Sequence, residues 1–340
     1  MTSLAIDYHG GGTLIPRSYE PVEPGPGEVR IAVAYTGICG TDLKIAHGAM
    51  DQRVSSPWPI GHEMSGTIDS LGAGVEGWQV GDKVTVMPLN WCDSCPACAA
   101  GHQHVCHNLD FVGIDSPGSL QQHWSVPVRL LVRVPDDLPL LTAAFAEPTA
   151  VAVHDVRRGQ VVPSDHVVVI GGGPIGLLIS LVANHLGADV LLSEVSAFRR
   201  KVADQLGIQT VDPTAYDLPA TVTGWTAGKG ADVAFEVSGS RAGVTALTDV
   251  LSVRGRGVVV AIHTEPAPFD LMAMFWKELD VSGARVYQRR DFDEAIGLLT
   301  AGVIPADSLV TDVVALAETE KAIERLGSGE DIVKLIIDSQ

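Results

Sequence analysis

The stretch VVIGGGPIG, residues 168–176, joins a short β-branched run to an apolar segment that continues to residue 186. This pattern predicts a buried strand, a glycine turn and a helix. The three glycines fit G-x-G-x-x-G, where the first allows the turn, the second lets the backbone approach a pyrophosphate and the third lets the helix pack on the strand. N–H groups at the helix start would face the phosphate charge. The predicted cofactor contacts are Gly171, Gly173, Pro174, Ile175 and Gly176.

A carboxylate follows the next predicted strand, residues 189–193. Glu194 stands eighteen positions after Gly176. A carboxylate at this place accepts hydrogen bonds from the adenosine ribose and repels a 2′-phosphate. Arg199 and Arg200 either line the adenosine pocket or are solvated helix charges, and the pair also allows an NADP site, which Glu194 opposes. The alternative is a buried strand, turn and helix with no ligand, but turn, helix and acid in register predict an NAD site.

Composition excludes several classes of partner. The chain has 340 residues, enough for two domains, and carries 23 basic against 41 acidic residues, a net charge of −18. This balance argues against nucleic acid and against an anionic membrane surface. The uncharged run 167–184 is interrupted by the glycine turn, so a buried strand and helix explain it better than a membrane span. With no signal peptide visible, we expect a cytoplasmic protein.

The pattern of elements changes near residue 150. Residues 1–145 show short strands separated by Gly and Pro turns, and from about residue 151 helices and strands alternate. The alternation predicts an α/β doubly wound parallel sheet. Its strands are expected at 167–171, 189–194, 208–211, 231–238, 256–262 and 281–286, with helices between them that include 197–206 and 241–251. A helix at 292–301, a strand at 310–315, a helix at 318–328 and a strand at 332–337 follow. Whether this tail returns to the first part stays open.

Four of the five cysteines form one cluster. Cys92, Cys95, Cys98 and Cys106 have the spacing C-x2-C-x2-C-x7-C. Four thiolates this close can enclose a tetrahedral zinc ion with no open position, which is a structural site. Four free thiols would be exposed to oxidation, and no thioredoxin-like context favours a redox pair. His102, His104 and His107 lie beside the cluster and are interpreted as surface residues.

The fifth cysteine, Cys39, has two interpretations. It is either a small buried hydrophobic residue or a ligand of a second metal. Candidate partners are His62 with Glu63, and Glu147, an acid inside an apolar run. A buried acid is costly unless it is paired or binds a metal. Cys, His and Glu with one open position would form a catalytic zinc site, but the sequence separation of these residues leaves the choice open.

Taken together, the motifs resemble the zinc-dependent medium-chain alcohol dehydrogenases, and most closely their polyol branch of sorbitol, 2,3-butanediol and threonine dehydrogenases. The resemblance covers essentially the whole chain. It rests on Cys39-Gly40-Thr41-Asp42, Gly61-His62-Glu63, the four-cysteine lobe, Glu147-Pro148 and the glycine turn. It implies a Rossmann nucleotide domain, residues 150–285, inserted in a β-rich GroES-like catalytic domain formed by residues 1–149 and 286–340, with the active site in the cleft.

The resemblance also implies roles for single residues. Cys39, His62 and Glu147 would be ligands of a catalytic zinc, and Glu63 would either ligate it or lie just behind it. Thr41 would pass the substrate proton away from the metal, and Asp42 would orient the His62 ring. Relatives often carry a histidine five positions after the ligand cysteine, where this chain has Lys44. The proton relay therefore ends at His47, at water or at the cofactor ribose.

The expected activity follows from this resemblance. It is hydride transfer between NAD(H) and a secondary alcohol or ketone, with a polyol, vicinal diol, sugar or hydroxy amino acid as substrate. Two zinc ions per chain, one catalytic and one structural, and a homodimer or homotetramer are expected. An NADP-dependent reductase and a non-catalytic nucleotide-binding protein of this fold are the alternatives. Trp58, Phe111 and Tyr287 are candidates for either the substrate pocket or the core.

Overall fold

The structure, a computed structural model, describes residues 2–54 and 57–340. The chain forms two compact units. The first comprises Met1–Glu147 with Gln288–Gln340, and the second comprises Pro148–Tyr287. The first division lies inside helix α4 (Ala146–Arg158). The boundaries expected from the sequence fall after residues 149 and 285.

The first unit is organised by a seven-stranded sheet. Six strands have the order β10-β6-β5-β3-β18-β17, and β9 also pairs with β3. Inward side chains of β3 and β5, among them Ile31, Met64 and Ile68, are almost fully buried and form the core with Trp124. The strands of this sheet are β3 (Glu28–Gly37), β5 (Glu63–Leu71), β6 (Lys83–Val86), β9 (His123–Pro127), β10 (Leu131–Arg133), β17 (Val310–Ala315) and β18 (Lys334–Asp338).

Smaller elements complete this unit. The other strands are β1 (Ser3–Tyr8), β2 (Leu14–Tyr19), β4 (Trp58–Pro59), β7 (Leu89–Asn90) and β8 (Asp110–Phe111). The helices are α1 (Gly40–Ala46), α2 (Pro96–Ala99), η1 (Gln103–Val105), η2 (Val128–Leu130), α3 (Leu140–Ala143), α10 (Arg289–Thr300), α11 (Ala306–Leu309), η3 (Leu316–Glu318) and α12 (Thr319–Gly327). The strands β1, β2 and β4 form a separate sheet, and β7 pairs with β8.

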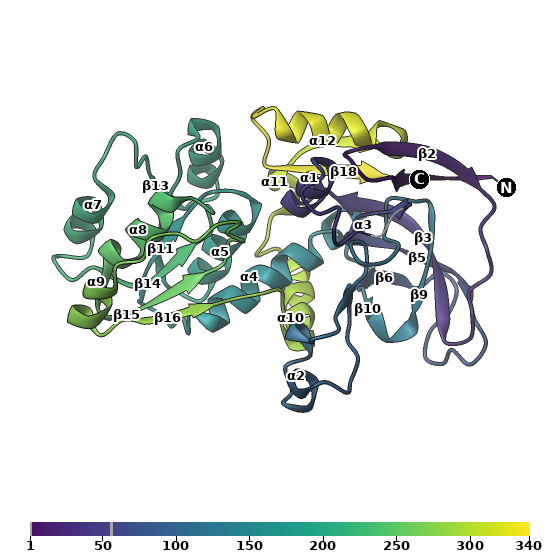
Figure 1. Cartoon of the computed structure of the whole chain (residues 1–340), viewed down its shortest axis with the longest axis horizontal. Coiled ribbons are helices and arrows are strands. Elements are labelled where there is room, and N and C mark those ends of the chain that lie inside the picture. Colours follow the sequence, from purple (N-terminus) through teal and green to yellow (C-terminus); the bar gives the residue numbers. More distant parts are fainter. Residues whose placement is uncertain (1, 55–56) are drawn as a thin grey trace. The chain divides into compact units, whose positions relative to one another are not determined.

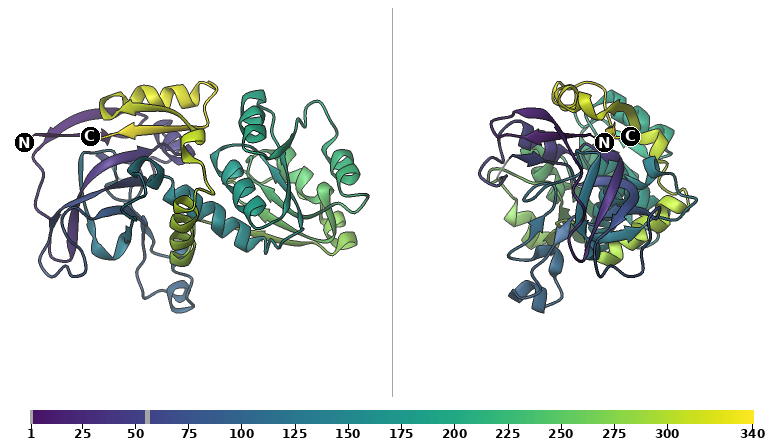
Figure 2. Two further views of the ribbon diagram at one scale, coloured as in Figure 1. Left: turned by 180° about the vertical axis from the view of Figure 1, so that it is seen from behind. Right: turned by 90° about the vertical axis from the view of Figure 1, so that its right-hand side faces the viewer.

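The C-terminal tail belongs to the first unit, a point that element patterns alone left open. Strand β18 pairs antiparallel with β3, with Ile336 opposite Gly37, and parallel with β17. In Figures 1 and 2 the yellow strand β18 runs beside the purple strands of the N-terminal part. Leu335, Ile336 and Ile337 are fully buried, so the tail completes the hydrophobic core of this unit.

The second unit is the doubly wound sheet that the alternating pattern predicts. Its strands are all parallel and have the order β13-β12-β11-β14-β15-β16. Figure 1 shows helices lying against these strands. The strands are β11 (His166–Ile170), β12 (Asp189–Ser193), β13 (Gln209–Val211), β14 (Ala231–Glu236), β15 (Leu251–Val259) and β16 (Asp280–Gly283), and the helices are α5 (Pro174–His185), α6 (Ala197–Gln205), α7 (Leu218–Trp225), α8 (Arg241–Val250) and α9 (Leu271–Lys277).

The predicted α/β fold class is therefore confirmed, with corrections at element ends. The last parallel strand, expected to reach residue 286, ends at Gly283, because Val286 has a φ of 48°, outside the extended region. Helix α5 begins at Pro174 rather than at residue 177, since proline suits the first turn of a helix. Within the described residues, no helix is long and apolar enough to cross a membrane.

Candidate active site and structural metal centre

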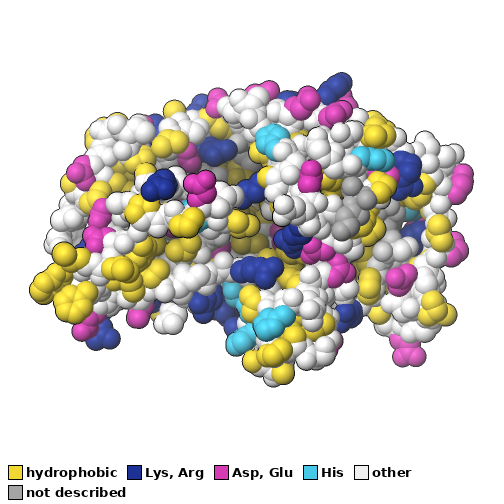
Figure 3. All heavy atoms as spheres, viewed as in Figure 1, with side chains coloured by type: hydrophobic (Ala, Val, Ile, Leu, Met, Phe, Trp, Pro, Cys, Tyr) yellow, Lys and Arg dark blue, Asp and Glu magenta, His cyan; other side chains and the backbone are white. Residues whose placement is uncertain are grey.

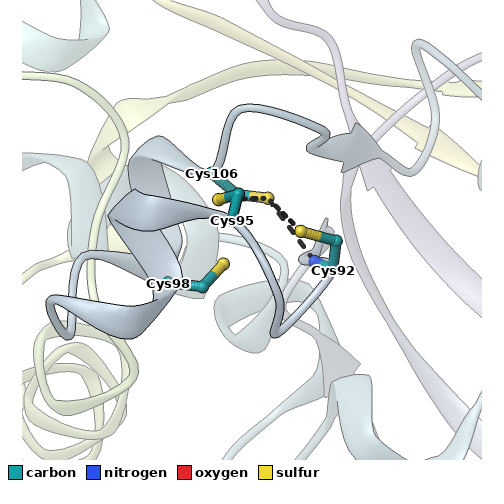
Figure 4. Close-up of side chains that lie close together, drawn as sticks. All are labelled: Cys92, Cys95, Cys98 and Cys106. Carbon is teal, nitrogen blue, oxygen red and sulfur yellow. Dashed lines mark hydrogen bonds between the residues drawn. The ribbon is translucent and has the colours of Figure 1, made fainter.

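The four-cysteine motif folds into a small lobe of its own. Cys95 is the N-cap of the short helix α2, Cys98 lies within that helix, and Cys106 follows η1. Cys92 lies two residues after the end of β7. Figure 4 shows the four side chains converging from these separate segments. Three of the thiols are buried, and all four remain free rather than forming disulfides.

The spacing of the sulfur atoms fits a tetrahedral zinc ion. The four Sγ atoms lie within 4.8 Å of one another. The Sγ atoms of Cys95 and Cys106 are 3.8 Å apart, and those of Cys106 and Cys92 are 3.5 Å apart. Ligands about 2.3 Å from a common ion in tetrahedral geometry lie about 3.8 Å apart, so the lobe matches the size of a closed zinc–thiolate site.

Hydrogen bonds prepare this lobe for negative charge. The backbone N–H groups of His107 and Asn108 donate to Cys95 and Cys106 at 3.4 and 3.3 Å. Hydrogen bonds, first among them those from Ser94, lower the pKa of Cys92 to about 5, whereas burial raises the pKa of Cys98 to about 12. Four thiolates at neutral pH therefore need a cation among them, as a structural zinc site requires.

A second cluster brings together residues that are far apart in sequence. Cys39 is the N-cap residue of α1, His62 immediately precedes β5, and Glu63 is the first residue of β5. One ligand atom from each lies within 4.8 Å of the others. Thiolate, imidazole and carboxylate are the ligands that zinc takes in catalytic sites, so the donor set fits this metal.

Asp42 lies behind His62. Its Oδ1 is 3.7 Å from His62 Nδ1, and its Oδ2 accepts a hydrogen bond of 2.8 Å from the Cys39 backbone N–H. Burial lowers the pKa of His62, but the charge of Asp42 and a hydrogen bond with Cys39 outweigh burial and raise it to about 10. The carboxylates around His62 thus favour positive charge at this position.

Glu63 has a cationic partner that the sequence analysis missed. Lys334, in β18, donates from Nζ to Glu63 Oε2 and, at 2.9 Å, to the carbonyl oxygen of Ile38. Both side chains are 2% exposed. Burial lowers the pKa of Lys334, but the charge of Glu63 outweighs burial and raises it. A lysine inside the apolar stretch 332–337 was the available signal, of the same kind that drew attention to Glu147.

Glu147 belongs to the same neighbourhood. It is the second residue of α4, is 4% exposed, and its charge contributes to raising the pKa of His62. The polar cluster thus contains a thiol, an imidazole, three acids (Asp42, Glu63 and Glu147) and one lysine. An open zinc site takes three protein ligands, and this cluster offers more than three candidates. With Cys39 and His62 as two ligands, Glu63 and Glu147 are alternatives for the third position.

Thr41 and His47 lie on one short helix. Thr41 is half-buried in the first turn of α1, and His47 is the exposed C-cap residue. Their backbones are separated by six residues, a rise of about 9 Å along a helix. Direct proton transfer from the Thr41 hydroxyl to His47 would therefore need an intermediate carrier.

The glycine turn in the second unit fits a pyrophosphate. Gly171 has a φ of 110°, which only glycine adopts freely. A Cβ on Gly173 would meet no protein atom within 4 Å, whereas a Cβ on Gly176 would lie 1.8 Å from the Gly171 oxygen. One glycine thus faces open space at the start of α5, and another is required for helix packing, as a dinucleotide turn demands.

Glu194 lies beside this turn and is largely engaged with it. Its Oε2 accepts from the backbone N–H of Gly172 and its Oε1 from that of Ser196, each at 2.6 Å. Arg200 is held by Asp212 at 2.8 Å and by the carbonyl oxygen of Glu194 at 2.7 Å. Arg199 is half-buried and its backbone N–H is bound by the Ser196 N-cap. Of the two arginines, Arg200 is thus part of the local structure.

The three aromatic candidates differ in environment. Phe111 meets the His62 ring edge to face, with centroids 5.4 Å apart. Trp58 is half-buried in β4. Tyr287 is fully buried and therefore belongs to the core.

Comparison with known families agrees with this geometry. Residues 25–136 match the model of the alcohol dehydrogenase GroES-like domain, and residues 174–301 match the model of the zinc-binding dehydrogenases. Fold and site define a zinc-dependent oxidoreductase that uses a nicotinamide cofactor. The chain belongs to the zinc-dependent alcohol dehydrogenase family, which confirms the resemblance found in the sequence.

Relatives match over nearly the full length. The chain is 47% identical to 2-dehydro-3-deoxy-L-galactonate 5-dehydrogenase of Pseudoalteromonas atlantica over 335 residues, 98% of each protein. It is 33% identical to sorbitol dehydrogenase of Halalkalibacterium halodurans, covering 99% of each. Among solved structures, a zinc-binding dehydrogenase of Sinorhizobium meliloti bound to NADP has a TM-score of 0.94, 28% identity and coverage of 99% of each chain.

Proposed function

We propose that the protein oxidises a secondary alcohol of a polyol or sugar acid with NAD, or catalyses the reverse reduction. The observation that carries this proposal is the cluster of half-buried Cys39 with buried His62 and Glu63, and Glu147 beside it, in a chain whose second unit holds a glycine turn that fits a dinucleotide. The substrate class is supported by the relatives, which are named for a sugar acid and for sorbitol.

We propose a separate role for each residue of the cluster. Cys39, His62 and Glu147 would hold the catalytic zinc, with Glu63 within reach as a fourth ligand. Zinc, when bound, supplies a Lewis acid that stabilises negative charge on the substrate oxygen. Asp42 holds the backbone of Cys39 and faces the back of His62, which fixes the direction of both ligands. The four-cysteine lobe would hold the second, structural zinc.

Thr41 is the proposed acceptor of the substrate hydroxyl proton. It lies two residues after Cys39 on α1, so a hydroxyl group is available beside the ligand thiolate. The helix rise between Thr41 and His47 is too long for one hydrogen bond, so a relay that ends at His47 would need an intermediate carrier, and water or the cofactor ribose are the alternative ends. A nicotinamide cofactor held by the second unit would supply the hydride acceptor.

We propose NAD as the preferred cofactor, held by Gly171, Gly173, Pro174, Ile175 and Gly176, with Glu194 at the adenosine ribose. Each Glu194 oxygen accepts one backbone hydrogen bond and keeps a second lone pair for a ribose hydroxyl. An NADP preference remains the competing proposal, since one solved relative binds NADP. Arg199 is the residue that would support it, because Arg200 is engaged by Asp212.

Replacing Glu194 distinguishes the two cofactor proposals. Losing a charged hydrogen bond changes binding by more than about tenfold, so Glu194→Gln should shrink a wild-type preference for NAD. The measurement is kcat/KM for NAD and NADP at one ionic strength, with Arg199→Ala as the matched control. A wild-type preference for NADP, or a ratio that Glu194→Gln leaves unchanged, would remove Glu194 from the ribose.

A substrate screen tests the reaction itself. The purified zinc-loaded protein is incubated with NAD and a panel of polyols, sugar acids, vicinal diols and aminoalcohols, and NADH is followed by absorbance. We expect turnover with a polyol or a sugar acid and none in a Cys39→Ser control. Turnover restricted to primary alcohols, or none with any secondary alcohol and either cofactor, would contradict the proposal.

We also propose that the protein is a homo-oligomer. Four large apolar side chains of α9, Leu271, Met272, Phe275 and Trp276, are 69–74% exposed. Figure 3 shows hydrophobic side chains gathering over α9. They offer about 500 Å² of apolar surface, a large part of the roughly 800 Å² per partner in a stable interface. A second copy is the proposed occupant, and a wild-type monomer in analytical ultracentrifugation at micromolar concentration would contradict this proposal.

A further inference from the structure

We propose that His263 positions the nicotinamide half of the cofactor, through the ring nitrogen Nδ1 that its partner Glu236 leaves free. The inference rests on the proposed function, because it takes the second unit to be the site of a nicotinamide dinucleotide. It begins from a buried acid and a histidine that the proposed chemistry does not use.

The pair lies at the edge of the sheet where dinucleotides bind. Glu236 is the last residue of β14, and His263 follows the carboxyl end of β15. Ligands of open parallel sheets bind outside the carboxyl ends of the strands, where the strand order reverses. Here the order reverses between β11 and β14.

The glycine turn touches the segment that carries this pair. A Cβ on Gly171 would lie 2.8 Å from the backbone nitrogen of Ser238, and the Val237 N–H donates to the Ile170 oxygen at 2.9 Å. Since Glu194 follows β12, the adenosine is placed over the β11–β13 half of the sheet. The nicotinamide riboside therefore extends over β14 and β15, next to His263.

Both carboxylate oxygens of Glu236 have partners within the second unit. Glu236 is completely buried, and its Oε1 accepts from the Ser238 hydroxyl at 2.6 Å and from the Gly239 N–H at 2.9 Å. Its Oε2 lies 2.8 Å from His263 Nε2. Oε1 is thus occupied within its own turn, and Oε2 is the oxygen that faces the histidine ring.

This arrangement fixes the ring and leaves one nitrogen for a ligand. The His263 side chain is 19% exposed, and Nδ1 has no hydrogen-bond partner among residues 2–54 and 57–340. An imidazole nitrogen at this position can pair with a ribose hydroxyl or with the carboxamide, both of which offer a donor and an acceptor. The neighbouring Ile262 is 70% exposed at the same edge, an apolar side chain that a flat nicotinamide ring would cover.

Two amide substitutions separate a cofactor contact from a purely structural pair. In His263→Asn the amide stands where Nδ1 stood, and in His263→Gln it stands where Nε2 stood. A contact made by Nδ1 is therefore kept by asparagine and lost by glutamine. If His263 only holds Glu236 through Nε2, that contact is kept by glutamine and lost by asparagine.

The experiment is a titration of the protein with NADH and, separately, with ADP-ribose, which lacks the nicotinamide. We expect His263→Gln to raise the Kd for NADH about three- to tenfold, the loss of one hydrogen bond, and His263→Asn to stay within about twofold of wild type. The Kd for ADP-ribose should stay within about twofold in both variants. Thermal midpoints close to wild type confirm that both variants fold.

Three results would overturn the inference: NADH affinity unchanged in His263→Gln, equal losses in both variants, or equal weakening of NADH and ADP-ribose. If wild-type protein binds both ADP-ribose and NADH and the variants bind NADH with the same Kd, only the role of His263 is refuted. Wild-type protein that binds neither ligand refutes the proposed cofactor and this inference together.

Discussion

The chain holds two clusters of metal-binding residues, and they differ in how they are assembled. The lobe of Cys92, Cys95, Cys98 and Cys106 comes from fifteen consecutive positions and contains one kind of ligand. The cluster of Cys39, His62 and Glu63 combines three kinds of ligand with a buried aspartate and a buried lysine. A closed, uniform shell holds a metal for folding, whereas a mixed shell with unused polar groups leaves room for chemistry.

The difference also appears in the charge around each site. In the lobe, backbone N–H groups are directed at the sulfur atoms. The negative charge of four thiolates there would be neutralised by a bound cation. The mixed cluster has an internal cation, Lys334, that already neutralises Glu63. We therefore expect the lobe to lose its fold without metal and the mixed cluster to keep its fold, because part of its charge is balanced by the protein.

The largest expected effect is on turnover. Cys39→Ser or His62→Ala should lower kcat by about a thousandfold or more, since a Lewis acid contributes several kcal/mol to the transition state. The Kd for NADH and the thermal midpoint should change little, because the glycine turn belongs to the other unit. Activity within tenfold of wild type in either variant would remove the mixed cluster from catalysis.

The next largest effect is on stability. Cys98→Ser or Cys95→Ser should lower the thermal midpoint by about 10 °C, because a structural zinc contributes folding free energy to its lobe. The zinc content should fall by one ion per chain, while kcat per folded molecule stays close to wild type. An unchanged midpoint with one zinc lost would show that the lobe does not depend on its metal.

A smaller effect is expected behind the mixed cluster. Asp42→Asn keeps the size of the side chain but removes its charge, and loss of such a partner weakens metal affinity about 10- to 100-fold. Competition with a chelator measures this affinity, and the second zinc of the same sample is the internal control. Equal weakening of both zinc ions would mean that the substitution acts through general destabilisation.

The sequence was informative where the residues of a feature are close together in the chain. The glycine turn, the four-cysteine lobe and the alternating strands could be recognised because each is a pattern of residues near one another in sequence. For the mixed cluster the residues alone left two interpretations open and the resemblance favoured the metal site, since Cys39 and His62 come together only after β3 and β5 pair.

Lys334 could not be placed from the sequence at all. Its contact with Glu63 joins residues 271 positions apart, and it exists because β18 returns to pair with β3. The engagement of Arg200 by Asp212 likewise depends on how the segments that follow β12 and β13 are arranged in space. Such pairings are set by tertiary packing rather than by local periodicity.

Stepwise removal of zinc tests most directly the claim that the two clusters have different roles. The purified protein is dialysed against increasing chelator, and zinc content, turnover and thermal midpoint are measured on each sample. We predict about two zinc ions per chain, with the first ion lost together with turnover at a nearly unchanged midpoint, and the second lost together with the fold. A single zinc ion per chain, or turnover that disappears only when the protein unfolds, would contradict the account.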